Sequence, residues 1–157
     1  MTSPSRIPLL SKEEALQRGR ELGISDYIAQ MNIFRMLLNH PKLAGELNST
    51  IISLVSGDKA VSDRCREIII MRVSWKAYCD YEWSQHWLAS LFFGLTEQEL
   101  VSIRHWQQAE CFNADEKTLL AATDELLDNG KISESVWQQL KAIFITDQAL
   151  IEVITCI

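Results

Sequence analysis

The chain has 157 residues, of which 47% are hydrophobic, a size that suits one domain with a buried core rather than two domains of average size. Its formal net charge of −6 and isoelectric point near 5.1 give no overall basic field for phosphates, so nucleic acid is not an expected partner. No apolar run approaches the roughly 18 residues that cross a bilayer, and the first residues lack the apolar core of a secretory signal, so we expect no membrane partner and a cytosolic location.

Helix signals recur along the whole sequence. Only six glycines and three prolines interrupt the chain, and no alternating run of β-branched residues lies between turn signals. We therefore predict an all-α fold. Residues 7–10 precede the first helix signal and are expected to lie as an extended arm on a neighbouring surface. The pattern Ser/Thr-x-x-Glu, whose end side chains satisfy free backbone amides, then predicts helix starts at 11–14 ("SKEE") and 96–99 ("TEQE").

Between these two starts, the first expected helix runs through "YIAQMNIFRMLL". Ser25 or Asp26 can cap its start, and its apolar spacing places Ile33 and Leu38 on a core-facing side. The helix should end before Pro41, because proline restricts the residue that precedes it and is well suited to the first turn of the next helix.

A helical pair is expected over residues 62–93. Ser62 or Asp63 can cap "RCREIIIMRVSWKAY", a break is expected near Cys79, and Gly94 closes the pair because glycine tolerates the left-handed conformation at a helix end. Further helices are expected at about 114–128, 134–144 and 147–157.

Three side chains with possible chemistry fall in the stretch "YCDYEWSQH". At 100° per residue, Cys79, Glu82 and His86 lie within about 60° of arc on one helix face, so they can meet one pocket. Glu82 and His86 are four positions apart and can hydrogen-bond, which fixes the imidazole and raises its pKa by favouring the charged form, as suits a general acid or base. Cys79 sits near a helix start, where the helix dipole and an imidazolium favour the reactive thiolate. Glu67, among apolar residues of the preceding helix, can complete the cluster.

The same residues also have ordinary structural explanations. A Glu/His pair at this spacing is common on exposed helices, a lone cysteine is often a small buried residue, and Glu67 can pair with one of the arginines at positions 64, 66 and 72. A metal site is not expected, since Cys79 and His86 lack further ligands and one Glu-x-x-x-His cannot supply a di-iron centre. We predict no cofactor.

Longer segments carry a resemblance to a known family. The run "CREIIIMRVSWKAYCDYEWSQHWLAS", with "NIFRMLLNHPKLAGEL" before it and "TDELLDNGKISESVWQQL" after it, resembles the carboxymuconolactone decarboxylase family, which is related to the alkyl hydroperoxidase D (AhpD) proteins. The similarity extends from about "IPLL" to "ALIEV" and implies a single domain over residues 1–157. It implies an AhpD-like helical bundle built on a central helical hairpin, a homo-oligomer (trimer or hexamer), and an active site near a subunit contact. Relatives usually continue beyond "IEVITCI", so the end of the last helix is expected to be missing.

Two chemistries occur in the family that the chain resembles. The hydroperoxidase branch has a glutamate, a CxxC and a histidine; Glu67, Cys79 and His86 match these positions, but Glu82 replaces the second cysteine, which attacks peroxide in that branch. A peroxidase would therefore need an external reductant or a distant cysteine. The decarboxylase branch carries a glutamate four positions before its histidine, which is the relation of Glu82 to His86. Its reaction removes carbon dioxide from a lactone acid and reprotonates carbon.

The sequence thus favours an enzyme that performs acid/base chemistry on a small lactone or carboxylated metabolite. In this hypothesis His86 is the general acid or base, Glu82 orients it, and Glu67 holds or relays a proton. The first alternative is a thiol-dependent peroxidase that acts through Cys79. The second is a catalytically silent oligomeric binding module in which Glu82 and His86 serve packing. Because "CDYEWSQH" is closest to uncharacterised relatives with "YEW" before the histidine, the resemblance does not specify the substrate.

Overall fold

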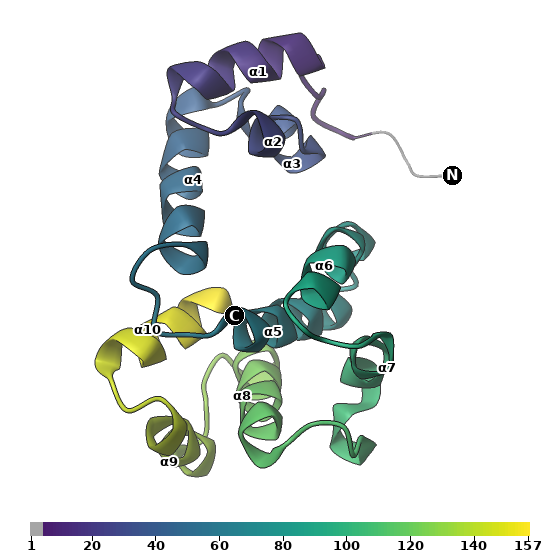
Figure 1. The fold of residues 1–157 in the computed structure, drawn as a ribbon, viewed down its shortest axis with the longest axis vertical. Helices are drawn as coiled ribbons and strands as arrows, with labels where there is room; N and C mark the ends of the chain where they lie inside the picture. The colour runs from purple at the N-terminus through teal and green to yellow at the C-terminus, as the bar shows by residue number, and fades with distance from the viewer. Residues whose placement is uncertain (1–4) are drawn as a thin grey trace. The chain divides into compact units, whose positions relative to one another are not determined.

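The computed structural model describes residues 5–157, and every regular element among them is a helix (Figure 1). This confirms the all-α prediction. The chain divides into two compact units, one up to Gly57 and one from Asp58 onward. That the whole chain forms a single domain stays a prediction. Within the described residues, no helix is long and apolar enough to cross a membrane.

The described residues of the first unit form four helices: α1 (Lys12–Glu21), α2 (Asp26–Ala29), α3 (Asn32–Leu37) and α4 (Pro41–Val55). Ser11 starts α1 with the predicted capping box. The segment before it lies against α3, where the Leu10 N–H donates to the Arg35 carbonyl at 3.1 Å and Arg35 Nε donates back to the Leu10 carbonyl at 2.8 Å. The Asn39 side-chain amide also donates to the Pro8 carbonyl at 3.0 Å, so backbone and side-chain hydrogen bonds hold the N-terminal arm.

The prediction of one helix through "YIAQMNIFRMLL" is wrong, because this segment forms two helices, α2 and α3. Met31 is extended, with φ −65° and ψ 141°, and caps the start of α3. Ala29 and Phe34 are both buried in the core of this unit. Five positions apart on one continuous helix, they would point about 140° apart, so the break lets both side chains enter the core. Leu38 is buried as expected, whereas Ile33 is 38% exposed.

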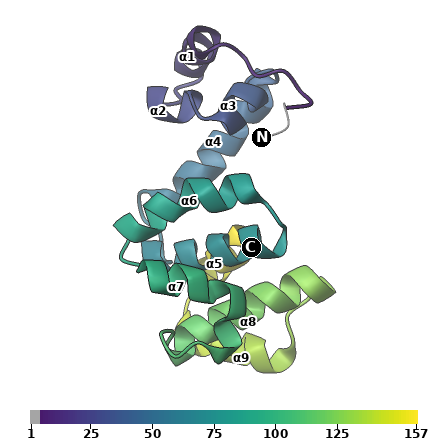
Figure 2. The same cartoon turned by 90° about the vertical axis from the view of Figure 1, so that its right-hand side faces the viewer.

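The second unit is built around α5. Its elements are α5 (Asp63–Lys76), α6 (Asp80–Phe92), α7 (Glu97–Ser102), the 3₁₀ helix η1 (Ile103–Gln108), α8 (Ala114–Asn129), α9 (Glu134–Ile143) and α10 (Asp147–Cys156). Helices α5 and α6 lie side by side as a hairpin (Figure 2). Ile69 packs into a core shared with α8, α9 and α10, while Ile68 and Met71 pack into a second core with α7, η1 and α8. Apolar residues on several sides of α5 are therefore needed to fill both cores.

The helix boundaries of this unit follow local signals. Ser62 caps α5 by accepting a hydrogen bond from the Cys65 N–H, and Thr96 starts α7 with the predicted capping box. Gly94 follows α6 with φ 90°, a conformation that favours glycine. The predicted break near Cys79 is confirmed, because α5 ends before it and α6 begins directly after it.

Candidate active site

The hairpin turn places Cys79 at the start of α6. The Cys79 N–H donates to the Ser74 carbonyl at 2.9 Å and the Tyr78 N–H donates to the Trp75 carbonyl at 3.2 Å, which is the hydrogen-bond pattern of a Schellman turn. Tyr78 occupies its left-handed position, with φ 53°, where glycine is usual. Cys79 is the N-cap residue of α6, makes no side-chain capping bond and is exposed. The thiol is therefore accessible at a turn with a strained residue beside it.

His86 lies between two carboxylates. Its Nδ1 is 2.8 Å from Oε2 of Glu67, and its Nε2 is 3.2 Å from Oε1 of Glu82. Exposure of the side chains rises along this array, from 2% for Glu67 through 29% for His86 to 43% for Glu82. The structure thus joins the buried Glu67 of α5 to the more exposed Glu82 of α6 through one imidazole.

The two carboxylates control the charge of the ring. Burial by itself lowers the pKa of His86, but the hydrogen bonds to Glu67 and Glu82, together with their negative charges, outweigh burial and raise this pKa to about 9. The hydrogen bond from His86 in turn lowers the pKa of Glu82, against the opposing effect of burial. At neutral pH, His86 is therefore an imidazolium that forms ion pairs with Glu67 through Nδ1 and with Glu82 through Nε2.

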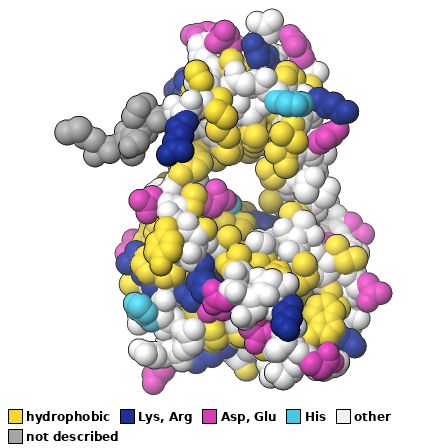
Figure 3. Space-filling view, turned by 180° about the vertical axis from the view of Figure 1, so that it is seen from behind, with side chains coloured by type: hydrophobic (Ala, Val, Ile, Leu, Met, Phe, Trp, Pro, Cys, Tyr) yellow, Lys and Arg dark blue, Asp and Glu magenta, His cyan; other side chains and the backbone are white. Residues whose placement is uncertain are grey.

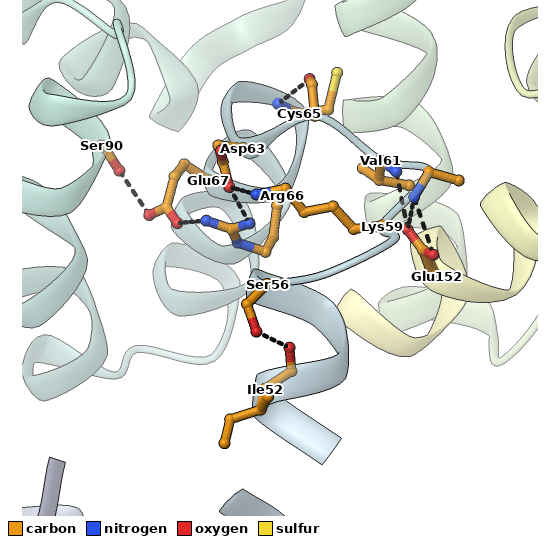
Figure 4. Close-up of polar contacts among 12 residues, drawn as sticks. Ile52, Ser56, Lys59, Val61, Asp63, Cys65, Arg66, Glu67, Ser90 and Glu152 are labelled. Carbon is orange, nitrogen blue, oxygen red and sulfur yellow. Dashed lines mark hydrogen bonds and ion pairs between the residues drawn. The ribbon is translucent and has the colours of Figure 1, made fainter. Parts of the chain in front are cut away.

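Two further side chains satisfy Glu67. Arg66 Nη2 donates to Glu67 Oε1 at 3.2 Å, and the Ser90 hydroxyl donates to Glu67 Oε2 at 3.2 Å. Figure 4 shows Glu67 pointing from α5 toward Ser90 on α6, with Arg66 on its other side. With His86 as a third donor, this carboxylate is buried without loss of hydrogen bonds. Glu67 thus joins both the arginine and the histidine that the sequence offered as alternatives.

A cavity of about 310 Å³ borders one end of the array. Glu82 and Cys79 contribute polar groups to its wall, and most of the remaining lining is apolar, including Ile70 and Val73 of α5. His86 does not line this cavity and meets it only through Glu82. The sequence placed Cys79, Glu82 and His86 in one pocket, whereas the structure puts the first two on its wall and the imidazole behind Glu82. Within the described chain, no group of three or more His, Cys, Asp or Glu side chains is arranged to hold a metal ion.

The hairpin of α5 and α6 lies within a longer segment that matches a known protein family. Residues 42–125, more than half of the chain, match the carboxymuconolactone decarboxylase family. The chain belongs to this family. No curated protein matches the chain. The carboxymuconolactone decarboxylase family includes both decarboxylases and AhpD-like peroxidases, so membership alone does not select the chemistry.

The segment matched to the carboxymuconolactone decarboxylase family contains all four residues selected from the sequence: Glu67, Cys79, Glu82 and His86. Sequence reasoning missed Ser90, although it lies four positions after His86 and thus near the same helix face. It also missed Cys156 of α10, which lines the same cavity as Cys79. No local spacing relates these two cysteines, because only the packing of α10 brings them to one cavity.

Proposed function

We propose that this member of the carboxymuconolactone decarboxylase family catalyses decarboxylation, or a related proton transfer, on a small lactone or carboxylated metabolite. The observation that carries the proposal is the array in which His86 contacts both Glu67 and Glu82, and which ends at a cavity of about 310 Å³. A charged imidazolium held behind a cavity-lining carboxylate is a store for the proton that such a reaction consumes.

The proposed step begins when the substrate loses carbon dioxide and its electron pair remains on carbon. His86 passes its proton to Glu82 across the 3.2 Å ion-pair contact, and Glu82 then gives that proton to the carbon. Glu82 carries the proton only in passing, because its lowered pKa disfavours the protonated carboxyl group. The neutral ring then regains a proton from water through its exposed part. Glu82 thus delivers the proton, whereas the sequence suggested that it only orients His86.

Glu67 acts as a positioning residue in this scheme. Its hydrogen bond to Nδ1 fixes the ring, and its negative charge helps to keep the ring protonated until the substrate requires the proton. Arg66 and Ser90 hold the carboxylate in turn.

The test is carbon dioxide release from a panel of carboxylated lactones by wild type, His86→Gln and Glu82→Gln. His105→Gln is the matched control, since this histidine is exposed and lies in the same unit. We expect turnover to fall by about 10²–10⁴ in the first two variants and to be unchanged in the control. Turnover that survives His86→Gln unchanged would refute the proton-transfer assignment.

A second candidate function is a thiol peroxidase, which is favoured by the shared cavity of Cys79 and Cys156. The Cys79 thiolate would attack a hydroperoxide, releasing an alcohol and leaving a sulfenic acid on its sulfur. The Cys156 thiol would condense with the sulfenic acid, releasing water and forming a disulfide that an external dithiol reduces. Dithiothreitol-dependent consumption of an organic hydroperoxide by wild type and Cys79→Ser tests this candidate. Loss of hydroperoxide consumption in Cys79→Ser would support the peroxidase function. Consumption no faster than background in wild type would contradict it.

We also propose that the protein is a homo-oligomer, a trimer or hexamer as the family resemblance implies. Neighbouring exposed apolar side chains support this, because a contiguous apolar patch on the surface marks a site of contact with a partner. On α6, Leu88 is 73% exposed and Phe92 is 83% exposed, one helical turn apart. Figure 3 shows apolar side chains gathered on the surface of the first unit. The test is molar mass by light scattering, with Phe92→Ser expected to lower it; a monomeric wild type would contradict the proposal.

A further inference from the structure

An arginine packed against two tryptophans borders a second cavity. This cavity, of about 120 Å³, shares Ser74 and Cys79 with the larger one. The guanidinium of Arg104 lies 4.9 Å from the ring centroid of Trp75 and 5.0 Å from that of Trp83. Both distances are within the range of cation–π contacts. The two rings therefore hold the guanidinium in place at the wall of the cavity.

The hydrogen-bonding capacity of Arg104 is unused. Its Nε is buried without a hydrogen-bond partner, and its side chain forms no hydrogen bond or ion pair with any described residue. Other arginines of this unit differ, since Arg64 binds Glu99 and Arg72 binds Asp124. A guanidinium carries five N–H donors in a planar fork that matches a carboxylate. Unused donors beside a cavity point to a ligand that supplies acceptors.

We propose that this second cavity binds the carboxylate group of a small organic acid. No described residue accepts a hydrogen bond from the Arg104 guanidinium, so its planar fork can form two parallel N–H···O bonds with a carboxylate. The start of α6 adds positive potential, because Cys79 makes no side-chain capping bond to the first-turn amides. Asp80 also lines the cavity and opposes an anion, but its side chain is exposed, so water screens its charge.

The position of this site deepens the proposed function. Ser74 and Cys79 belong to the walls of both cavities, so a carboxylate held at Arg104 lies next to the cavity that Glu82 lines. Arg104 would then select acids over neutral lactones and place the reacting carbon. This role in turnover rests on the proposed function, whereas binding of a carboxylate at Arg104 does not.

The test is a fluorescence titration with propanoate, because Trp75 and Trp83 border the cavity. Propanamide, which has nearly the same shape and no charge, is the control ligand. Lys131→Gln is the control variant, since it removes an exposed positive charge from the same unit. We expect saturable quenching by propanoate in wild type and Lys131→Gln, affinity at least about tenfold weaker in Arg104→Gln, and no saturation with propanamide.

Three results would overturn the site: no saturable response to propanoate in wild type, equal affinity in Arg104→Gln, or equal affinity for propanamide. If Arg104→Gln does not fold, Arg104→Lys takes its place; it keeps the charge but loses the planar fork, and undiminished affinity would overturn the proposed two-bond contact. Because the titration requires no turnover, its failure is distinguishable from failure of the lactone assay. If propanoate binds but none of the lactones is turned over, the carboxylate site is supported and only the proposed function is contradicted.

Discussion

Raising the pH is expected to destabilise the second unit by removing the proton from His86. The ordinary pKa of 6.5 applies to the unfolded chain, and the folded value is about 9. At about 1.4 kcal/mol per unit, this difference corresponds to about 3 kcal/mol of the free energy of unfolding. The folded protein binds the proton more tightly, so this stabilisation is fully present below about pH 6.5, falls as the pH rises, and is lost above about pH 9.

Urea denaturation followed by tryptophan fluorescence measures this effect, because all five tryptophans lie in the second unit. Other groups also titrate over this range, so the informative quantity is the difference between wild type and His86→Gln. We expect that difference to shrink by about 3 kcal/mol between about pH 6 and about pH 10. His105→Gln, the matched control, should follow the wild-type curve. Parallel curves for wild type and His86→Gln would contradict this prediction, since no proton would then be linked to folding at His86.

Three further substitutions give expected outcomes. Tyr78→Gly should raise the free energy of unfolding by up to about 1 kcal/mol in urea denaturation, because φ 53° strains a non-glycine residue; a loss of stability would contradict this. Arg72→Met should cost about 3–5 kcal/mol in the same assay, because it leaves the partly buried Asp124 without its ion pair; a cost below 1 kcal/mol would contradict this. Glu67→Gln should lower the pKa of His86 from about 9 toward 6.5 in an NMR titration, and an unchanged value would contradict the role of this charge.

Local signals account for the parts of the fold that the sequence predicts. Ser62 and Thr96 mark helix starts because a capping side chain acts on amides two or three residues away. The break at Met31 is different. No glycine or proline marks it, and its cause is the burial of both Ala29 and Phe34 in a core that depends on tertiary packing. The hydrophobic periodicity along one helix cannot predict such a boundary.

In the candidate site too, some contacts follow from sequence spacing and others depend on tertiary packing. Glu82 and His86 are four positions apart, so their contact follows from helix geometry alone. Glu67 comes from another helix, and the sequence could select it only through its apolar surroundings and the family resemblance. Arg104 and Cys156 have no sequence relation to Cys79, and the packing of η1 and α10 alone brings them to the cavities.

The most direct test of the account is nitrogen-15 NMR of the His86 ring at about pH 7.5. The charge of this ring underlies both the proposed proton transfer and the dependence of stability on pH. We expect both ring nitrogens to be protonated, each facing a carboxylate. One protonated and one unprotonated nitrogen, as in a neutral imidazole, would contradict it, because the ring would then hold no proton to deliver through Glu82.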